Sequence, residues 1–129
     1  MLKLRSDQMT LGIQEETDFV RWFVNDYMPE NLPHIHQVFT PEELNTLVRN
    51  GRNQAIQHGF HQPVNQTHFI TFMWNIGANF YDTPAFKPIL ENNHLSESEK
   101  IKQFYQVSDE DWEKSIQQAN EQYWLKEAL

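Results

Sequence analysis

Residues 40–59 carry a complete set of signals for one helix, and that helix limits what the neighbouring segments can do. Thr40, Pro41 and Glu43 place an N-cap hydroxyl, a proline at the first helical position and a capping-box carboxylate in the required order. Gly59 supplies the left-handed residue that commonly ends a helix. Between them, apolar or small residues recur every three or four positions, at Leu44, Leu47, Val48, Gly51, Ala55 and Ile56. This spacing predicts one apolar stripe, and small residues within it allow another helix to approach closely.

A second helix is predicted directly after the first, from about Gln62 and Pro63 to Gly77. Phe72 and Trp74 lie off its apolar stripe, so the helix is either central to a small bundle or keeps one face for a partner. The stripe itself comprises Phe69, Ile70, Met73 and Ile76. Asp82, Thr83 and Pro84 then predict a turn that caps a short helix bearing Phe86, Ile89 and Leu90.

Three further segments complete the expected fold. A helix over residues 6–28 should bury Met9, Ile13, Val20, Phe23, Val24 and Tyr27 and end at Pro29. Residues 29–39 are expected to form a loop. Ser96 with Glu99 forms a second capping box, and Ser108 begins a last helix whose stripe is Trp112, Ile116, Ala119 and Tyr123. No strand-like alternation is sustained, so we expect an all-α, compact bundle of about five to six helices, forming a single helical domain over residues 1–129.

Composition narrows the possible functions. The chain has no cysteine, which excludes thiol chemistry and zinc–thiolate sites. No window approaches the roughly 20 apolar residues of a membrane span, and no signal-peptide pattern is present, so we expect a cytoplasmic protein. The net charge of −8 argues against nucleic-acid binding and favours a protein partner with a basic surface. The same charge is also typical of a solvated acidic surface that keeps a protein soluble.

Candidate residues for chemistry are few. Of the six histidines, His58 and His61 are separated by Gly59, and His34 with His36 has no nearby carboxylate to orient either ring. There is no nucleophile elbow, no glycine-rich phosphate loop and no His-Glu-x-x-His motif. Acidic pairs fall mostly in first helical turns, where capping explains them. We therefore predict no catalytic residue, no metal site and no cofactor, and the protein is not expected to be an enzyme.

Aromatic residues are the stronger functional signal. The chain has nine phenylalanines, four tyrosines and four tryptophans, more than a small core needs. Trp22 lies off the stripe of its helix, and Trp124 stands beside Tyr123 near the chain end. Each tryptophan could simply seal the edge of the bundle. Exposed aromatic residues surrounded by acidic ones are also typical of protein-binding surfaces. We therefore expect Trp22, Trp74 and Trp124 to contact a partner, with Trp74 the first choice.

A scattered set of mostly apolar and glycine positions forms a recognisable pattern over roughly the first three quarters of the chain. It comprises Met9, Phe19, Tyr27-Met28-Pro29-Glu30, Gly51-Arg52, Ala55, His58-Gly59-Phe60, Phe69-Ile70, Met73 and the run from Gly77 to Pro84. In these positions the chain resembles a known family of small helical proteins encoded in bacterial toxin loci, beside spike-tip proteins and effectors of the type VI secretion system. Within the run from Gly77 to Pro84, the resemblance implies that Phe80, Tyr81 and Asp82 belong to the partner-binding surface.

Three functional hypotheses follow. The resemblance implies an accessory or adaptor protein, chaperone-like, that binds a secreted toxin effector or its spike-tip carrier. The acidic surface, with the same genetic neighbourhood, is compatible with an immunity protein that neutralises a cognate toxin. An enzyme, such as the toxin itself, is disfavoured by the missing motifs. We favour the adaptor hypothesis.

Overall fold

The protein is described by a computed structural model over residues 15–126. In that range it is entirely helical, without a strand, and this confirms the predicted all-α class. Five α-helices have seven residues or more: α2 (Glu16–Trp22), α5 (Pro41–Gln57), α6 (Pro63–Asn75), α8 (Glu97–Gln106) and α9 (Asp109–Gln117). Shorter turns connect them: the π-helical turn η1 (Phe23–Tyr27), α3 (Met28–Asn31), α4 (Pro33–His36), the 3₁₀ turns η2 (Phe80–Asp82) and η3 (Glu121–Leu125), and α7 (Lys87–Leu90).

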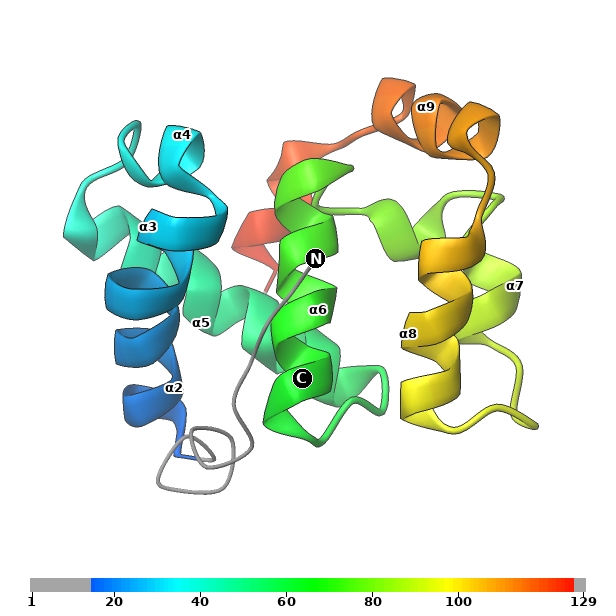
Figure 1. Ribbon diagram of the computed structural model, residues 1–129, viewed down its shortest axis with the longest axis horizontal. Helices are drawn as coiled ribbons and strands as arrows, with labels where there is room; N and C mark the ends of the chain where they lie inside the picture. The colour runs from blue at the N-terminus through cyan, green and yellow to red at the C-terminus, as the bar shows by residue number, and fades with distance from the viewer. Residues whose placement is uncertain (1–14, 127–129) are drawn as a thin grey trace.

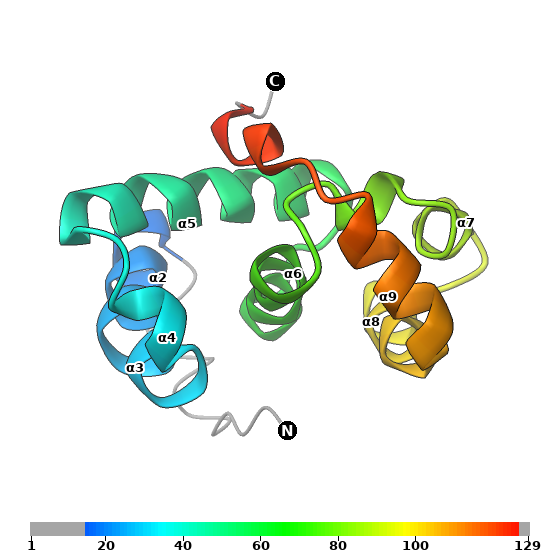
Figure 2. The same ribbon diagram turned by 90° about the horizontal axis from the view of Figure 1, so that it is seen from above.

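The central element is α6. In Figure 1 it lies between α2, α3 and α4 on one side and α7, α8 and α9 on the other. The second view shows α5 running behind α2, α3, α4 and α6, with η3 packed against it near the C-terminal end of the chain (Figure 2). Accordingly α5 packs against α2, α6 and η3, while α8 packs against α6 and α7. Phe72, which lies off the predicted stripe, is buried, as expected of a helix central to a small bundle, whereas Trp74 on the same helix is only half-buried.

Phenylalanine dominates the core. Eight of the nine phenylalanines are almost completely buried, at positions 19, 23, 60, 69, 72, 80, 86 and 104. Phe80 lies at their centre, with its ring 5.0 Å from that of Phe69 and 5.5 Å from those of Phe72 and Phe104. Many of these pairs are edge-to-face or tilted, which is the arrangement that the ring quadrupoles favour.

Four of the local signals for helix ends were accurate, those at Thr40, Gly59, Ser96 and Ser108. Thr40 and Glu43 form the predicted reciprocal capping box, and Ser96 and Glu99 form the second. The Ser108 hydroxyl accepts a hydrogen bond from the backbone N–H of Asp111, as expected of an N-cap. Gly59 has φ 93°, the left-handed conformation that the sequence predicted for the stop after α5. These devices need only residues within one turn of each other, so the sequence shows them directly.

The first predicted helix is corrected at its C-terminal end. Val20, Phe23, Val24 and Tyr27 are buried as expected, whereas Met9 and Ile13 lie outside the described residues. Pro29 does not end the helix, because the helical backbone continues through α3 to Asn31. In a regular α-helix the ring of a proline clashes with the backbone carbonyl four residues earlier. For Pro29 that carbonyl belongs to Asn25, which lies in the wider π-helical turn η1. The predicted loop over residues 29–39 is also partly helical, since it contains α4.

The last predicted helix is shorter than expected. It ends at Gln117, and Tyr123 lies in η3 instead of continuing the stripe of Trp112. Asn79, in a different part of the chain, stabilises the break: its Nδ2 donates to the Gln118 carbonyl at 3.0 Å, and its Oδ1 accepts from the Asn120 N–H at 2.6 Å. Residues 118–126, the C-terminal strap, then cross back over α5.

The predicted capping turn before α7 is also different. The Thr83 hydroxyl lies 2.6 Å from the Phe80 carbonyl, to which it donates, and 2.9 Å from the Ser115 hydroxyl, so it does not cap α7. Asp82 accepts a hydrogen bond from the Tyr123 hydroxyl at 2.9 Å. The helix accordingly begins only at Lys87, without a side-chain cap.

Candidate functional site

An apolar groove lies where α4, α5, α6 and the C-terminal strap meet, and we call it the Trp74 groove. It has a volume of about 460 Å³. Seven of the nine residues that line it are apolar and two are polar. The lining comprises His34, Ile35, Val38, Phe39, Leu47, Trp74, Glu121, Trp124 and Leu125. A groove of this size and composition is typical of a site that takes several apolar side chains at once.

The floor of the groove is a cluster of aromatic rings that are tilted against one another. The Trp74 ring centroid lies 4.1 Å from that of Trp124 and 5.6 Å from that of Phe39. Trp74 is half-buried, whereas Trp124 is only 4% exposed. The indole N–H of Trp74 is buried and has no acceptor among the described residues. The ring is therefore held by packing, and the groove offers a hydrophobic floor.

Two exposed side chains form the rim. Val38 is 72% exposed and Leu125 is 68% exposed. They are the most exposed large hydrophobic residues in the described range, and both line this groove. Scattered single hydrophobic residues on a surface need no explanation, but two at the same apolar groove form a patch, which makes the groove the candidate binding site.

The C-terminal strap supplies one wall, and side-chain amides of α5 hold it. Asn50 Nδ2 donates to the Trp124 carbonyl at 3.0 Å, and Gln54 Nε2 donates to the Tyr123 carbonyl at 2.7 Å. Gly51, between these two amides, lets Trp124 approach: a Cβ added there would lie 3.2 Å from the Trp124 ring. Gly51 was expected to allow close helix packing, and it therefore also leaves room for the strap.

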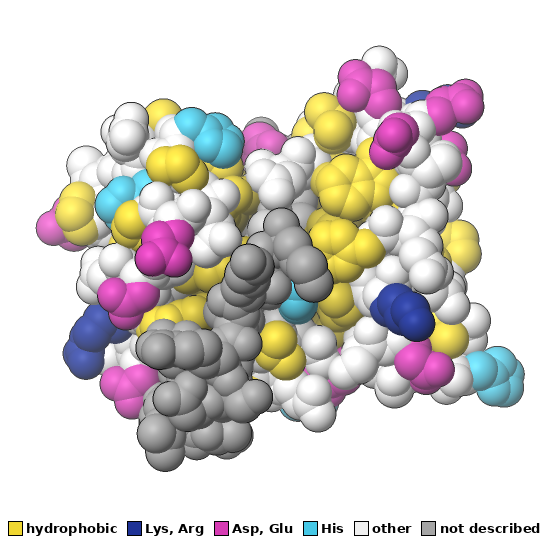
Figure 3. Space-filling view, in the orientation of Figure 1, with side chains coloured by type: hydrophobic (Ala, Val, Ile, Leu, Met, Phe, Trp, Pro, Cys, Tyr) yellow, Lys and Arg dark blue, Asp and Glu magenta, His cyan; other side chains and the backbone are white. Residues whose placement is uncertain are grey.

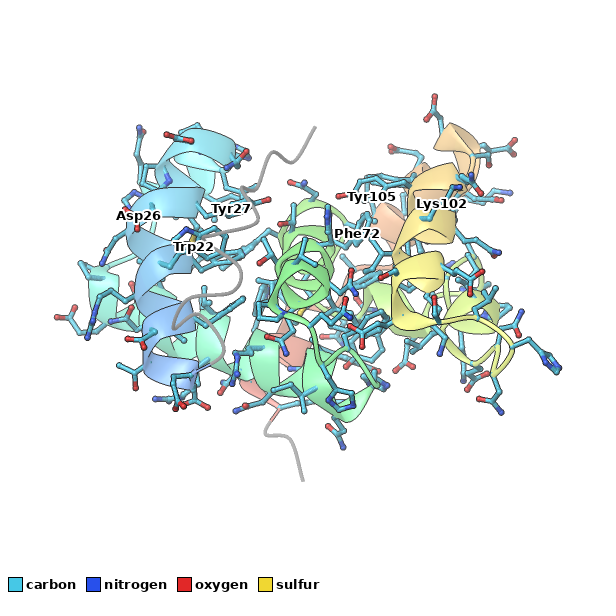
Figure 4. The ribbon with its side chains drawn as sticks, turned by 60° about the horizontal axis from the view of Figure 1, so that its bottom comes forward. Trp22, Asp26, Tyr27, Phe72, Lys102 and Tyr105 are labelled. Carbon is cyan, nitrogen blue, oxygen red and sulfur yellow. The ribbon has the colours of Figure 1, made fainter. Side chains whose placement is uncertain are left out.

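The predicted partner-binding residues divide into three groups. Trp74 and Trp124 come together in the groove. The second group, Trp22 and Asp82, does not line the groove. Trp22 is half-buried against Tyr27 with ring centroids 5.5 Å apart, and Figure 4 shows it on α2 near Tyr27 and Asp26. Asp82 is exposed but hydrogen-bonded to Tyr123.

Phe80 and Tyr81 form the third group, and here the surface role that the resemblance implied requires a correction. Phe80 is completely buried and Tyr81 nearly so. The Tyr81 hydroxyl donates to Gln54 Oε1 at 2.8 Å, and its burial raises the pKa of the phenol. A side chain that is enclosed in this way has no surface to offer a partner, so we remove both residues from the candidate site.

Sequence reasoning did not find most of the groove. Ile35, Val38, Phe39 and Leu47 were not proposed as contacts, and neither was Leu125. Val38 stands beside Phe39 and Leu125 beside Trp124, but neither residue falls on the apolar stripe of a predicted helix, so periodicity did not single them out. Only the folding of α4 and of the strap brings the two sides of the groove together.

Two features outside the groove concern charge and protonation: the acidic first turn of α9 and one histidine–tyrosine pair. Figure 3 shows acidic side chains gathered over α9 and hydrophobic ones between α6 and α8. Across that second region, His68 Nδ1 lies 2.7 Å from the Tyr105 hydroxyl. Burial lowers the pKa of His68 to about 4 and raises the pKa of Tyr105 to about 12. Neither group is therefore charged at neutral pH.

This pair predicts how stability depends on pH. In the unfolded chain His68 takes up a proton near pH 6.5, but in the folded protein only near pH 4, because burial disfavours its charged form. The free energy of unfolding should therefore fall as the pH drops from about 6.5 to about 4. Urea unfolding at several pH values measures this slope. His68→Gln should flatten it, and part should remain because burial also lowers the pKa of His58. An unchanged slope in the variant would show that His68 is not buried in solution.

Other classes of site find no support in the described range. No group of three or more His, Asp or Glu side chains there is arranged to hold a metal ion. No helix between residues 15 and 126 combines the length and apolar character that a membrane crossing requires. No family model matches the sequence, and no curated protein or solved structure shows a significant match to this chain.

Proposed function

We propose that this chain is a non-enzymatic accessory protein, of the adaptor or chaperone type, that holds a protein partner in the Trp74 groove. The observation that carries the proposal is the pairing of an apolar groove of about 460 Å³ with two highly exposed hydrophobic residues at its rim. A buried aromatic floor with an exposed apolar rim is the composition from which interface hot spots are built. The resemblance to proteins of type VI secretion loci supports a toxin effector or its spike-tip carrier as the partner.

The groove favours a particular shape of ligand. Its lining is formed by side chains from helices and turns, and no described strand edge is present to which an extended peptide could add. A helix that lays one apolar face into a hydrophobic groove is the recognition mode that fits such a lining. Glu121 is the only carboxylate among the lining residues, and the chain carries a net charge of −8. We therefore assign the groove to an amphipathic helix of the partner that carries a basic residue beside its apolar face.

Variants of the rim test this proposal with little effect on folding. Val38→Asp combined with Leu125→Asp should abolish recovery of the partner, because two charges would have to be buried at the interface. The measurement is affinity capture from the source bacterium, with identification of the captured proteins by mass spectrometry. Ile116→Asp is the matched control, since Ile116 is also exposed but does not line the groove. The double variant should unfold at nearly the wild-type temperature, because exposed positions usually contribute less than about 0.5 kcal/mol.

Only a partner whose capture depends on Val38 and Leu125 supports the proposal. A toxin or spike-tip protein that is captured by the wild type and by Ile116→Asp, but not by the double variant, supports the proposal. Equal capture by all three proteins places the interface elsewhere.

Trp74→Ala should weaken binding of the partner by about 2 kcal/mol, but it also removes the ring that packs against Trp124 at 4.1 Å, so the stability of the variant must be measured alongside. Recovery should fall with added salt if the acidic surface attracts a basic partner.

The immunity hypothesis is the alternative, and the net charge of −8 is the observation that favours it. An acidic protein can cover the basic substrate groove of a toxin and block it. Mixing the purified chain with its captured toxin separates the two functions. Retained toxin activity in the complex supports an adaptor, whereas stoichiometric inhibition supports an immunity protein.

A further inference from the structure

A second groove, of about 430 Å³, lies between the α2–η1 helix and the N-terminal half of α5, and we call it the arginine groove. Each wall presents residues spaced four apart, which is the spacing that puts side chains on one helix face. One wall has Thr17, Arg21 and Asn25, and the other has Pro41, Asn45 and Arg49. Neither this groove nor its residues take part in the Trp74 groove.

The side chains of the arginine groove are mostly hydrogen-bond donors. Each guanidinium offers five N–H groups in a planar fork, and each asparagine amide offers two more. The only carboxylate in the lining is Glu16, and it lies 4.0 Å from Arg52. Arg52 also lies over the Phe19 ring at 5.6 Å, with a side chain only 11% exposed, so packing holds it in place. The one negative group in the groove is therefore already matched by a positive one.

The two arginines of the lining are accessible to a ligand. In the range 15–126 Arg49 makes no ion pair. Arg21 lies 3.7 Å from Asp18, but both side chains are largely exposed, and exposed pairs of this kind contribute little. Arg21, Arg49 and Arg52 are all the arginines that the structure describes, and the described lysines do not line this groove. Arginine in place of lysine is the choice for planar, two-point recognition of carboxylates.

The backbone of the α2–η1 wall also has a feature that is typical of functional sites. Asn25 belongs to η1, the π-helical turn, where the regular helical spacing is interrupted. Such turns are rare and are frequently found at functional sites. Residues spaced by eight along a helix span about 12 Å, so each wall is longer than a single small anion.

We propose that the arginine groove binds an acidic segment of a protein, with Arg21 and Arg49 each holding one carboxylate and the two asparagines donating to the same segment. The length of the walls favours a short peptide over an isolated ion. The net charge of −8 opposes such a ligand at long range, so its attraction must come from these local contacts.

Direct titration with short peptides tests this inference. The probe is an acetylated, amidated tetraglutamate peptide, compared with the tetraglutamine peptide and with inorganic phosphate, by calorimetry or NMR. Tetraglutamate should bind, and Arg21→Gln and Arg49→Gln should each weaken its binding about threefold, as expected from the loss of one exposed charge pair. Arg49→Lys should recover only part of the loss, because lysine keeps the charge but not the fork. Lys102→Gln, an exposed change on α8, should bind like the wild type.

Three results would overturn the inference. Equal binding of the two peptides would show that charge is not recognised. Unchanged tetraglutamate binding in both glutamine variants would place the contact elsewhere. Phosphate that binds as tightly as the peptide would reassign the groove to a small anion. The Val38→Asp and Leu125→Asp double variant should bind tetraglutamate normally, so failure of one proposal is distinguishable from failure of the other.

Discussion

Phe80→Ala is expected to cost about 3–5 kcal/mol of the free energy of unfolding, the range for deleting a buried aromatic ring. The Phe80 ring is completely buried and lies within 5.0–5.7 Å of the rings of Phe69, Phe72, Tyr81, Phe86 and Phe104. Those neighbours come from α6, α8 and the segment before α7, so the cavity cannot close by moving one side chain. Because domains are commonly stable by only about 5–15 kcal/mol, this single change removes a large part of the total.

Urea denaturation measures the loss as a lower midpoint at an unchanged slope. Phe39→Ala is the matched control, because Phe39 is the one phenylalanine that is only half-buried, and it lines the Trp74 groove. Phe39→Ala should lower the midpoint less and weaken partner capture more. If Phe80→Ala kept its midpoint but lost the partner, Phe80 would lie at an interface, as the resemblance first implied, and the described core would be wrong.

Trp124→Ala is expected to cost about 3 kcal/mol and to disrupt the Trp74 groove at the same time. The Trp124 ring packs between Trp74 and the backbone of Gly51, which has no side chain to block it. Trp124 also anchors the strap that forms one wall of the groove. Without it, the carbonyls that Asn50 and Gln54 hold lose the packing that positions them. Stability and partner capture should therefore fall together.

Two readouts separate the effects of Trp124→Ala. Chemical denaturation gives the stability. Near-ultraviolet circular dichroism reports the contact between the Trp74 and Trp124 rings, whose signal should disappear. Leu125→Ala is the control: it changes the adjacent residue, which is mostly exposed, and should shift stability by less than about 0.5 kcal/mol. Wild-type stability in Trp124→Ala would mean that the strap does not dock on α5 in solution.

Capping residues and glycine correctly predicted the helix ends that depend on contacts within one turn. The capping boxes at Thr40 and Ser96 and the positive φ of Gly59 involve groups within one turn of each other, and each occurs as expected. The apolar stripe of α6 was also correct in its four residues, because periodicity identifies the buried face whatever packs against it. The all-α class followed from these elements.

Two helix ends were predicted wrongly, at Pro29 and in the last helix, because they depend on structure that local signals do not show. Pro29 was expected to stop a helix, but a π-helical turn before it accommodates the ring. The last helix ends at Gln117 because Asn79, 39 residues away in sequence from its hydrogen-bond partner Gln118, binds the backbone of the next turn. Propensity and spacing contain no information about such distant partners.

By itself, the sequence determined the all-helical class, the capped ends of α5, α8 and α9, and the buried faces of the central helices. It also identified Trp74 and Trp124 as unusual aromatic residues, although not as neighbours. Only the tertiary structure decided that Phe80 and Tyr81 belong to the core and that Val38 and Leu125 form the rim of a groove. The physical reason is range: capping and amphipathicity act within a few residues, whereas a groove exists only where segments distant in sequence fold against each other.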